Sequence, residues 1–283
     1  MSVAPDALEL RTVRGPSALG GGSRRFFELL WLMAVTEFKR TYFGTVLGYV
    51  WSLLRPLLLF AVLLFVFTRI FRLGSSVPHY AELLLFNIVL FGFFQESTTS
   101  AVTSVVAQEG IVRKTQFPRL VIPLSIVLTG LMYLGLNLIV VSVFIVAGGV
   151  EPTWTWLLLP VVVLALAVLT TAVSMLLSAV YVRFRDLLLI WTVFATMLFY
   201  GTPILYPINI PTTEGFRALL MTNPIAVILE QARVWIIDPT APTAAESAGG
   251  VLRLIPAALI FVGVCVLAWR VYNREAPRIA EAL

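Results

Sequence analysis

Long apolar runs separated by short polar connections dominate this sequence and limit the folds open to it. Each run is close to the roughly 20 apolar residues that a helix needs to cross a bilayer. Only 12% of the residues are charged and 59% are hydrophobic, and a soluble domain of this size could not bury so much apolar surface. The sequence therefore predicts an all-α polytopic integral membrane protein with six transmembrane helices. We place them near Trp51–Phe71, Leu83–Val106, Val121–Ala147, Trp154–Val182, Leu187–Leu205 and Leu252–Tyr272.

Basic residues are distributed unevenly between the predicted connections. Of the 20 lysines and arginines, 15 lie in the N-terminal segment, the second and fourth connections and the C-terminal tail. Cytoplasmic loops of membrane proteins are enriched in Lys and Arg, so both termini are predicted to be cytoplasmic. The membrane surface explains the net charge of +5 better than a nucleic acid partner does. Arginine far exceeds lysine, which is typical of a GC-rich bacterial genome and favours a bacterial plasma membrane.

The predicted domain organisation is one membrane domain with a short tail at each end. Residues 206–251 form a long outer connection in which Asn223 is predicted to cap a short helix that begins at Pro224. We expect that helix to dip back into the membrane rim. The remaining divisions are a flexible tail over 1–23, the membrane domain over 24–283, an amphipathic helix over 24–45, spans over about 51–272 and a cytoplasmic tail over 273–283.

The segment before the first span mixes apolar and charged residues at helical spacing. It is too charged to cross a bilayer, so we expect an interfacial helix lying along the cytoplasmic surface. The alternative is an ordinary helix packed against a partner.

No pattern typical of enzyme chemistry is present. The sequence contains no phosphate-binding G-x-x-x-x-G-K-[ST] loop and no G-x-S-x-G motif. His79 is the only histidine and has no Cys, His or Asp cluster beside it, so it is not expected to ligate a metal. Cys265 is the only cysteine and is interpreted as a packing residue. We therefore predict no catalytic residue, no metal site and no cofactor held by this chain.

Two of the charged residues inside the predicted spans are candidates for a functional role, because charge at membrane depth is costly. Arg55 precedes Pro56 near the cytoplasmic end of the first span. It either anchors the helix by snorkelling or contacts a substrate headgroup or gate. Glu96 lies in the polar half of the second span and is predicted to pair with another span or to act in function. Asn87 and Asn137 are expected to hydrogen-bond between helices.

Aromatic residues gather in two places, and two interpretations remain open. They form either an interfacial belt or the lining of a path for sugars, whose apolar faces stack on aromatic rings. The aromatic residues are Tyr42, Phe43, Tyr49 and Trp51 in the first group and Trp191, Phe194, Phe199, Tyr200 and Tyr206 in the second.

The connection from Glu109 to Arg119 is short and basic. It either supplies orientation charge or docks a cytoplasmic motor.

Several motifs in a fixed order resemble a known family. The resemblance is to the permease subunit of type-2 ABC exporters, in the polysaccharide and teichoic-acid export branch (Wzm-like), and it covers Arg24 to Arg274. The motifs are Tyr42–Pro56 with its Leu47-Gly48-x-x-Trp51 core, Val112–Arg119 followed by Pro123, Arg183-Phe184-Arg185-Asp186 with the later Thr202–Pro207, and Asn223-Pro224.

The resemblance implies a homodimeric permease that works with two copies of a separate ABC ATPase, which binds ATP and Mg. It implies a polyprenyl-diphosphate-linked glycan as cargo, of the O-antigen, teichoic-acid or cell-wall galactan type, and outer helices that close the outer mouth. An exporter of small hydrophobic drugs or lipids, and a membrane enzyme acting on polyprenyl-linked substrates, are the alternatives.

The residues to which roles are assigned fall into two sets. Substrate-path or gating residues are Tyr42, Phe43, Tyr49, Trp51, Arg55, Glu96, Trp191, Phe194, Phe199 and Tyr200. ATPase-docking residues are Arg25, Glu28, Glu109, Arg113, Lys114 and Phe117.

Overall fold

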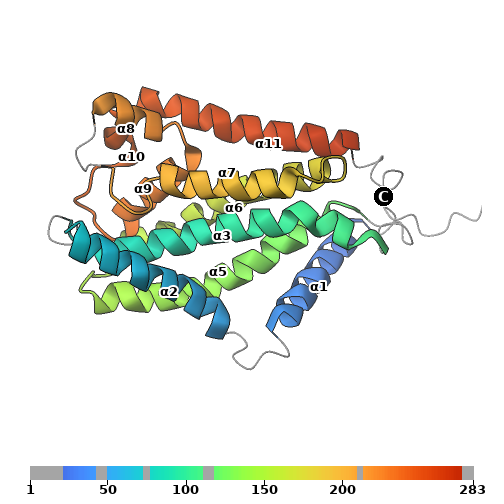
Figure 1. The fold of residues 1–283 in the computed structure, drawn as a ribbon, viewed down its shortest axis with the longest axis horizontal. Coiled ribbons are helices and arrows are strands. Elements are labelled where there is room, and N and C mark those ends of the chain that lie inside the picture. The colour runs from blue at the N-terminus through green and yellow to red at the C-terminus, as the bar shows by residue number, and fades with distance from the viewer. Residues whose placement is uncertain (1–21, 43–49, 73–76, 111–117, 209–212, 276–283) are drawn as a thin grey trace, which may run out of the picture.

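The computed structural model describes residues 22–42, 50–72, 77–110, 118–208 and 213–275, and within them every regular element is a helix. The longest helices run along the long axis of the molecule, as Figure 1 shows. This confirms the all-α prediction for the described residues. The long helices of the bundle are α2 (Val50–Phe65), α3 (Tyr80–Ala107), α5 (Val121–Ala147), α6 (Leu159–Tyr181), α7 (Leu187–Gly201) and α11 (Ile255–Glu275).

Four stretches in the described part of the chain are long and apolar enough to cross a membrane. Three of them extend a helix by a short turn of another type: a π-helix at Val66–Ile70 continues α2, and 3₁₀ turns at Trp154–Leu158 and Val251–Leu254 lead into α6 and α11. The fourth is α5. Helix α3 has the length but carries Gln95 and Glu96, and α7 has only 15 residues. A multi-pass membrane protein is therefore confirmed, whereas six crossings remain a prediction.

Helix α3 forms the centre of the bundle. It packs against α5 and α6 on one side and against α2 and α7 on the other. Every residue from Glu82 to Phe91 is buried. Apart from Glu82 and Asn87, this part of the helix is apolar on all sides, and such a helix is stable only inside other elements. The α3–α5 contact is close at Gly130, where an added Cβ would stand 2.2 Å from the Ser97 hydroxyl oxygen. Small residues at such crossings let helices approach in membranes.

Helix α1 (Gly22–Tyr42) packs on α5 through one face. Thr129 donates a hydrogen bond to the Ala34 carbonyl, and the Phe38 and Tyr133 rings stack with their centroids 4.8 Å apart. The opposite face exposes Leu32 among charged side chains. The helix begins two residues earlier than predicted, and residues 43–45 lie outside the described part. Its packing on α5 leaves that exposed face free for a membrane surface, so the interfacial role stays a prediction.

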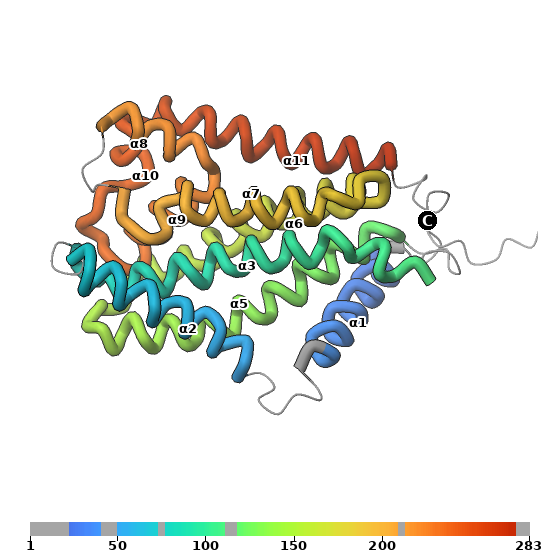
Figure 2. The backbone as a smooth tube through the Cα atoms, viewed as in Figure 1, coloured from blue at the N-terminus to red at the C-terminus, as the bar shows by residue number. Residues whose placement is uncertain are grey.

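Three short helices, α8 (Glu214–Leu220), α9 (Pro224–Ile236) and α10 (Ala244–Ala248), gather at one end of the bundle, and Figure 2 shows them away from α1. The predicted cap of α9 is confirmed, because the Asn223 side chain accepts a hydrogen bond from the Ile225 amide at 2.9 Å. Its amide group also donates to Thr202, just past the end of α7. One asparagine thus starts α9 and ties it to the bundle.

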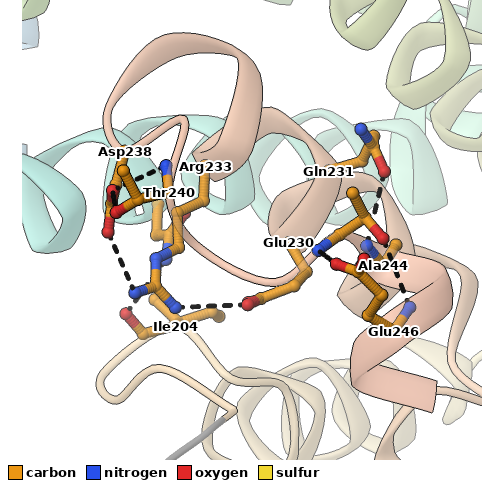
Figure 3. A network of polar contacts seen from close by, with 10 residues as sticks. Ile204, Glu230, Gln231, Arg233, Asp238, Thr240, Ala244 and Glu246 are labelled. Carbon is orange, nitrogen blue, oxygen red and sulfur yellow. Dashed lines mark hydrogen bonds and ion pairs between the residues drawn. The ribbon is translucent and has the colours of Figure 1, made fainter. Parts of the chain in front are cut away.

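Buried charges hold the end of α9, as Figure 3 shows. Arg233 lies 3.2 Å from the Glu230 carboxylate and 3.8 Å from the Asp238 carboxylate, and the arginine and Glu230 side chains are only 3% exposed. Thr240 donates a further hydrogen bond to Asp238. Burial raises the pKa of Glu230, and the charge and hydrogen bond of Arg233 oppose that rise. The three charges form one buried cluster that depends on the single guanidinium.

Candidate functional site

One side of α3 is polar and is left uncovered by the described part of the chain. Its members recur at intervals of three and four residues, so they share one face of the helix. Their neighbours at 93, 94, 97, 98, 101 and 102 are all buried. We call this face the α3 stripe; its exposed or half-buried members are Gly92, Gln95, Glu96, Thr99, Ser100 and Thr103.

An ion pair joins the α3 stripe to α2. The Arg55 guanidinium lies 3.3 Å from the Glu96 carboxylate, and the two side chains are 77% and 69% exposed. In water such a pair contributes at most about 1 kcal/mol, but at membrane depth each charge without the other would be costly. The structure therefore brings together the two span charges that the sequence analysis selected as candidates. Whether either contacts substrate stays a prediction.

Helix α7 supplies aromatic side chains that contact the buried side of α3. The Trp191 indole is 7% exposed, donates a hydrogen bond to the Thr98 hydroxyl at 3.2 Å and packs against Phe94. Phe199 is half-buried, with its ring 5.5 Å from that of Phe91. These two aromatic residues of the predicted path therefore lie in the α3–α7 contact.

Other predicted path residues lie on the surface. Phe194 and Tyr200 of α7 are 48% and 61% exposed, and Trp51 at the start of α2 is 54% exposed. Phe194 and Tyr200 stand among other exposed apolar side chains of α7, so this face of α7 needs lipid or protein to cover it. Tyr42 is the last residue of α1, whereas Phe43 and Tyr49 lie outside the described residues.

Comparison with known proteins identifies the family. The sequence matches the model of the ABC-2 type transporter family over residues 28–237, from α1 to the end of α9. This chain belongs to the ABC-2 type transporter family. The match confirms the resemblance to type-2 ABC exporter permeases that the sequence motifs showed.

Named relatives of this ABC-2 transporter chain are permeases. It is 31% identical to the O-antigen export system permease protein RfbA of Myxococcus xanthus, over 82% of this chain and 91% of the relative. It is 28% identical to a Klebsiella pneumoniae protein of the same name, over 91% of this chain and 95% of that protein. A second Klebsiella pneumoniae RfbA is 32% identical over 72% of this chain and 78% of the relative. The comparisons therefore identify a transport subunit and not an enzyme.

The predicted docking residues of the ABC-2 chain are only partly described. Arg25 and Glu28 are exposed on α1, where Glu28 pairs with Arg24 at 2.9 Å. Glu109 is half-buried just after α3, at the end of the bundle that α1 approaches. The remaining docking residues, Arg113, Lys114 and Phe117, lie outside the described residues, so a shared docking surface stays a prediction.

Some polar contacts of the ABC-2 chain went unrecognised in the sequence. Thr98 and Thr99 lie on neighbouring sides of α3, about 100° apart around the helix, and Thr98 is buried against Trp191 whereas Thr99 belongs to the α3 stripe. Helical spacing within the polar half of the second span could have separated them. The buried cluster around Arg233 could have been found from Glu230, three residues earlier on an apolar helix. Asn87 does bond across elements, to the Ile204 carbonyl, whereas Asn137 bonds back to its own helix.

Burial separates two roles among the aromatics of α7, and paired substitutions test them. Tyr200→Ala should change the free energy of unfolding by less than about 0.5 kcal/mol, as exposed substitutions usually do, while reducing export severalfold. Trp191→Phe should lower the free energy of unfolding by about 1–2 kcal/mol, because it removes a buried hydrogen bond. Thermal unfolding in detergent and an export assay measure the two effects. Wild-type export by Tyr200→Ala, with the same result for Phe194→Ala, would assign these rings to the lipid surface.

Proposed function

We propose that this chain is the permease subunit of an ATP-driven exporter that carries a polyprenyl-diphosphate-linked polysaccharide across a bacterial plasma membrane. The α3 stripe is the observation that carries the proposal. A polar face with an ion pair, on the central helix of an apolar bundle, is suited to a polar cargo and not to lipid contact. The names of the relatives, which are O-antigen export permeases, support an O-antigen type of glycan.

A second copy of the chain is the proposed cover for the stripe. Polar groups facing hydrocarbon would lack hydrogen-bond partners, and the α3 stripe lies between exposed apolar side chains of α2 and α7. Two copies that meet through α2 and α7 would enclose a conduit lined by two stripes, with apolar contacts on either side. Phe194, Tyr200 and Trp51 would then face the cargo or the partner copy.

The proposed membrane arrangement has six crossings and both termini in the cytoplasm. Helix α3 would be the second crossing and α7 the fifth, in addition to the four stretches that meet the length and hydropathy requirement. Helix α7 is about 22 Å long, so it falls short of the hydrocarbon thickness and is completed by the chain around Thr202. Helix α1 and the end of α11 lie toward the same end of the bundle, which an even number of crossings requires. Helices α8–α10 would then close the outer mouth.

Two copies of a separate ABC ATPase would supply the energy. The chain has no phosphate-binding motif, so ATP and Mg would be bound by that partner, and no cofactor by this chain. The exposed charges of α1 and the connection after α3 are the proposed contacts. A basic surface at that end also suits the lipid diphosphate, with which Arg pairs well.

Reconstitution tests the proposal. The permease and its ATPase, purified together in lipid nanodiscs, should hydrolyse ATP faster when a polyprenyl-diphosphate-linked glycan is added, because cargo binds the two transport states unequally. Polyprenyl diphosphate without sugar and glycan without lipid are the matched controls. Stimulation by amphiphilic drugs or phospholipids, with none by the lipid-linked glycan, would contradict the proposed cargo. Parallel assays with teichoic-acid and galactan precursors would distinguish the glycan class.

A further inference from the structure

A polar cavity that is open to the surface lies at the end of the bundle that carries α8–α10, away from the α3 stripe. It has a volume of about 330 Å³ and is bordered by three elements: the π-helix after α2, the start of α3 and the end of α5. Thr68, His79, Glu82 and Gly148 are among the residues that line it. None of these residues belongs to the proposed substrate path.

Glu82 is the unusual residue of this cavity. It is only 8% exposed, and within the described residues its carboxylate has no hydrogen-bond or ion-pair partner. A Cβ added at Gly148 would stand 1.8 Å from the Glu82 Oε1 atom. The glycine is therefore what admits the carboxylate to this position.

Glu82 lies between two helix ends of opposite polarity, the first turn of α3 and the C-terminus of α5. Gly148 is the C-cap of α5, and the last carbonyl groups of a helix carry a partial negative charge. The first turn of α3 therefore favours the carboxylate, whereas the end of α5 repels it. A cation in the cavity would interact favourably with both the carboxylate and the helix end.

We propose that this cavity binds a hydrated divalent cation, with Glu82 as its anionic ligand. Mg²⁺ gives up its waters reluctantly and is commonly held through only one or two carboxylates. Six waters take up about 180 Å³, which the cavity can hold. This proposal adds a site at His79 and Glu82 that the spacing of His, Cys and Asp in the sequence did not indicate.

Two neighbouring side chains have acceptor atoms suited to metal-bound water. The Thr68 hydroxyl donates its hydrogen to the Leu64 carbonyl at 2.6 Å, so its oxygen keeps lone pairs that can accept. An imidazole such as that of His79 has one acceptor nitrogen when it is neutral. Tyr80 directs its hydroxyl to the Leu205 carbonyl at 2.7 Å and is not needed as a ligand. Ion binding would link α2, α3 and α5 at this end of the bundle.

Electron paramagnetic resonance with Mn²⁺ tests the site on the full chain in neutral-lipid nanodiscs, without nucleotide. We expect saturable binding with a Kd of about 1 mM, as for weak extracellular cation sites, and competition by Mg²⁺. Glu82→Gln should weaken binding about tenfold or more, because it removes the anionic ligand. Gly148→Ala should also weaken it, because its Cβ displaces the carboxylate. Glu214→Gln, which removes an exposed carboxylate from α8, is the matched control and should bind as wild type.

A stability measurement separates the site from a structural role of Glu82. Mg²⁺ should raise the unfolding temperature of the wild type and of Glu214→Gln, but not that of Glu82→Gln, since a ligand stabilises only a state that binds it. Wild-type Mn²⁺ affinity in Glu82→Gln would overturn the proposal. Absence of saturable binding to the wild type would also overturn it. None of these measurements depends on export, so the outcome is independent of the proposed cargo.

Discussion

Exchanging the two charges of the α2–α3 ion pair, in an Arg55→Glu, Glu96→Arg double variant, is expected to preserve folding and reduce export at least tenfold. The exchange keeps a pair of opposite charges at the 3.3 Å contact, so neither charge is left alone at membrane depth. It moves the guanidinium from α2 to the α3 stripe. Hydrogen bonds to charged groups contribute about 1.5–3 kcal/mol, so loss of one Arg–diphosphate contact corresponds to roughly a tenfold to hundredfold effect. Export and thermal unfolding are measured on the same preparations.

The single variants show whether the pair is structural. Glu96→Gln and Arg55→Gln each leave one charge without its partner, so both should lower the yield of inserted protein while the double variant restores it. Arg69→Gln removes an exposed arginine at the other end of the same span and should match the wild type. Wild-type export by the double variant would show that the pair only holds α2 against α3. Failure of the double variant to insert would show that the pair depends on its orientation.

Arg233→Met is expected to lower the free energy of unfolding by about 3–5 kcal/mol. Removing one partner of a buried ion pair leaves an uncompensated charge in a low-dielectric site. Here Glu230 and Asp238 would both lose their counter-charge, and Arg233 and Glu230 are each only 3% exposed. Burial already raises the pKa of Glu230, so the variant should take up a proton at this carboxyl. Unfolding followed by tryptophan fluorescence in detergent measures the change.

A triple variant supplies the control for the buried cluster. Glu230→Leu, Arg233→Met and Asp238→Asn together remove every charge, and replacement of a whole buried cluster by apolar groups is often neutral or stabilising. The asparagine can still accept the hydrogen bond that Thr240 donates to Asp238 at 2.6 Å. The triple variant should therefore recover most of the lost stability. A triple variant as unstable as Arg233→Met would show that the arginine acts through its size and not its charge.

Local pattern was sufficient for much of the fold. The apolar runs predicted helices that the structure confirms, and the Asn223-Pro224 pair predicted the start of α9, because capping and proline effects act within one turn. Order and spacing of short motifs predicted the family. Helix ends were less predictable: α7 stops at Gly201 and not at Leu205. The chain turns there, where the Asn223 amide donates to Thr202 and the Asn87 amide of α3 donates to the Ile204 carbonyl.

The candidate site was predicted only in part. Arg55 and Glu96 were recognised because charge is rare at membrane depth, but their contact spans 41 residues of sequence. Trp191 and Tyr200 belong to the same aromatic group in the sequence, and the structure buries the first and exposes the second. Hydropathy alone cannot separate them, because a lipid tail and a protein core are equally favourable surroundings for an aromatic ring.

The sequence by itself determined that this chain resides in a membrane, folds as helices and belongs with ABC-2 type permeases. Those properties follow from composition, periodicity and motif order, each of which is local. Only the tertiary structure decided which charged side chains form ion pairs. Arg55 pairs with Glu96, Arg233 pairs with two carboxylates, and Glu82 has no partner among the described residues. The physical reason is that a charge is stabilised by its neighbours in space, and in a helix bundle those neighbours come from other helices.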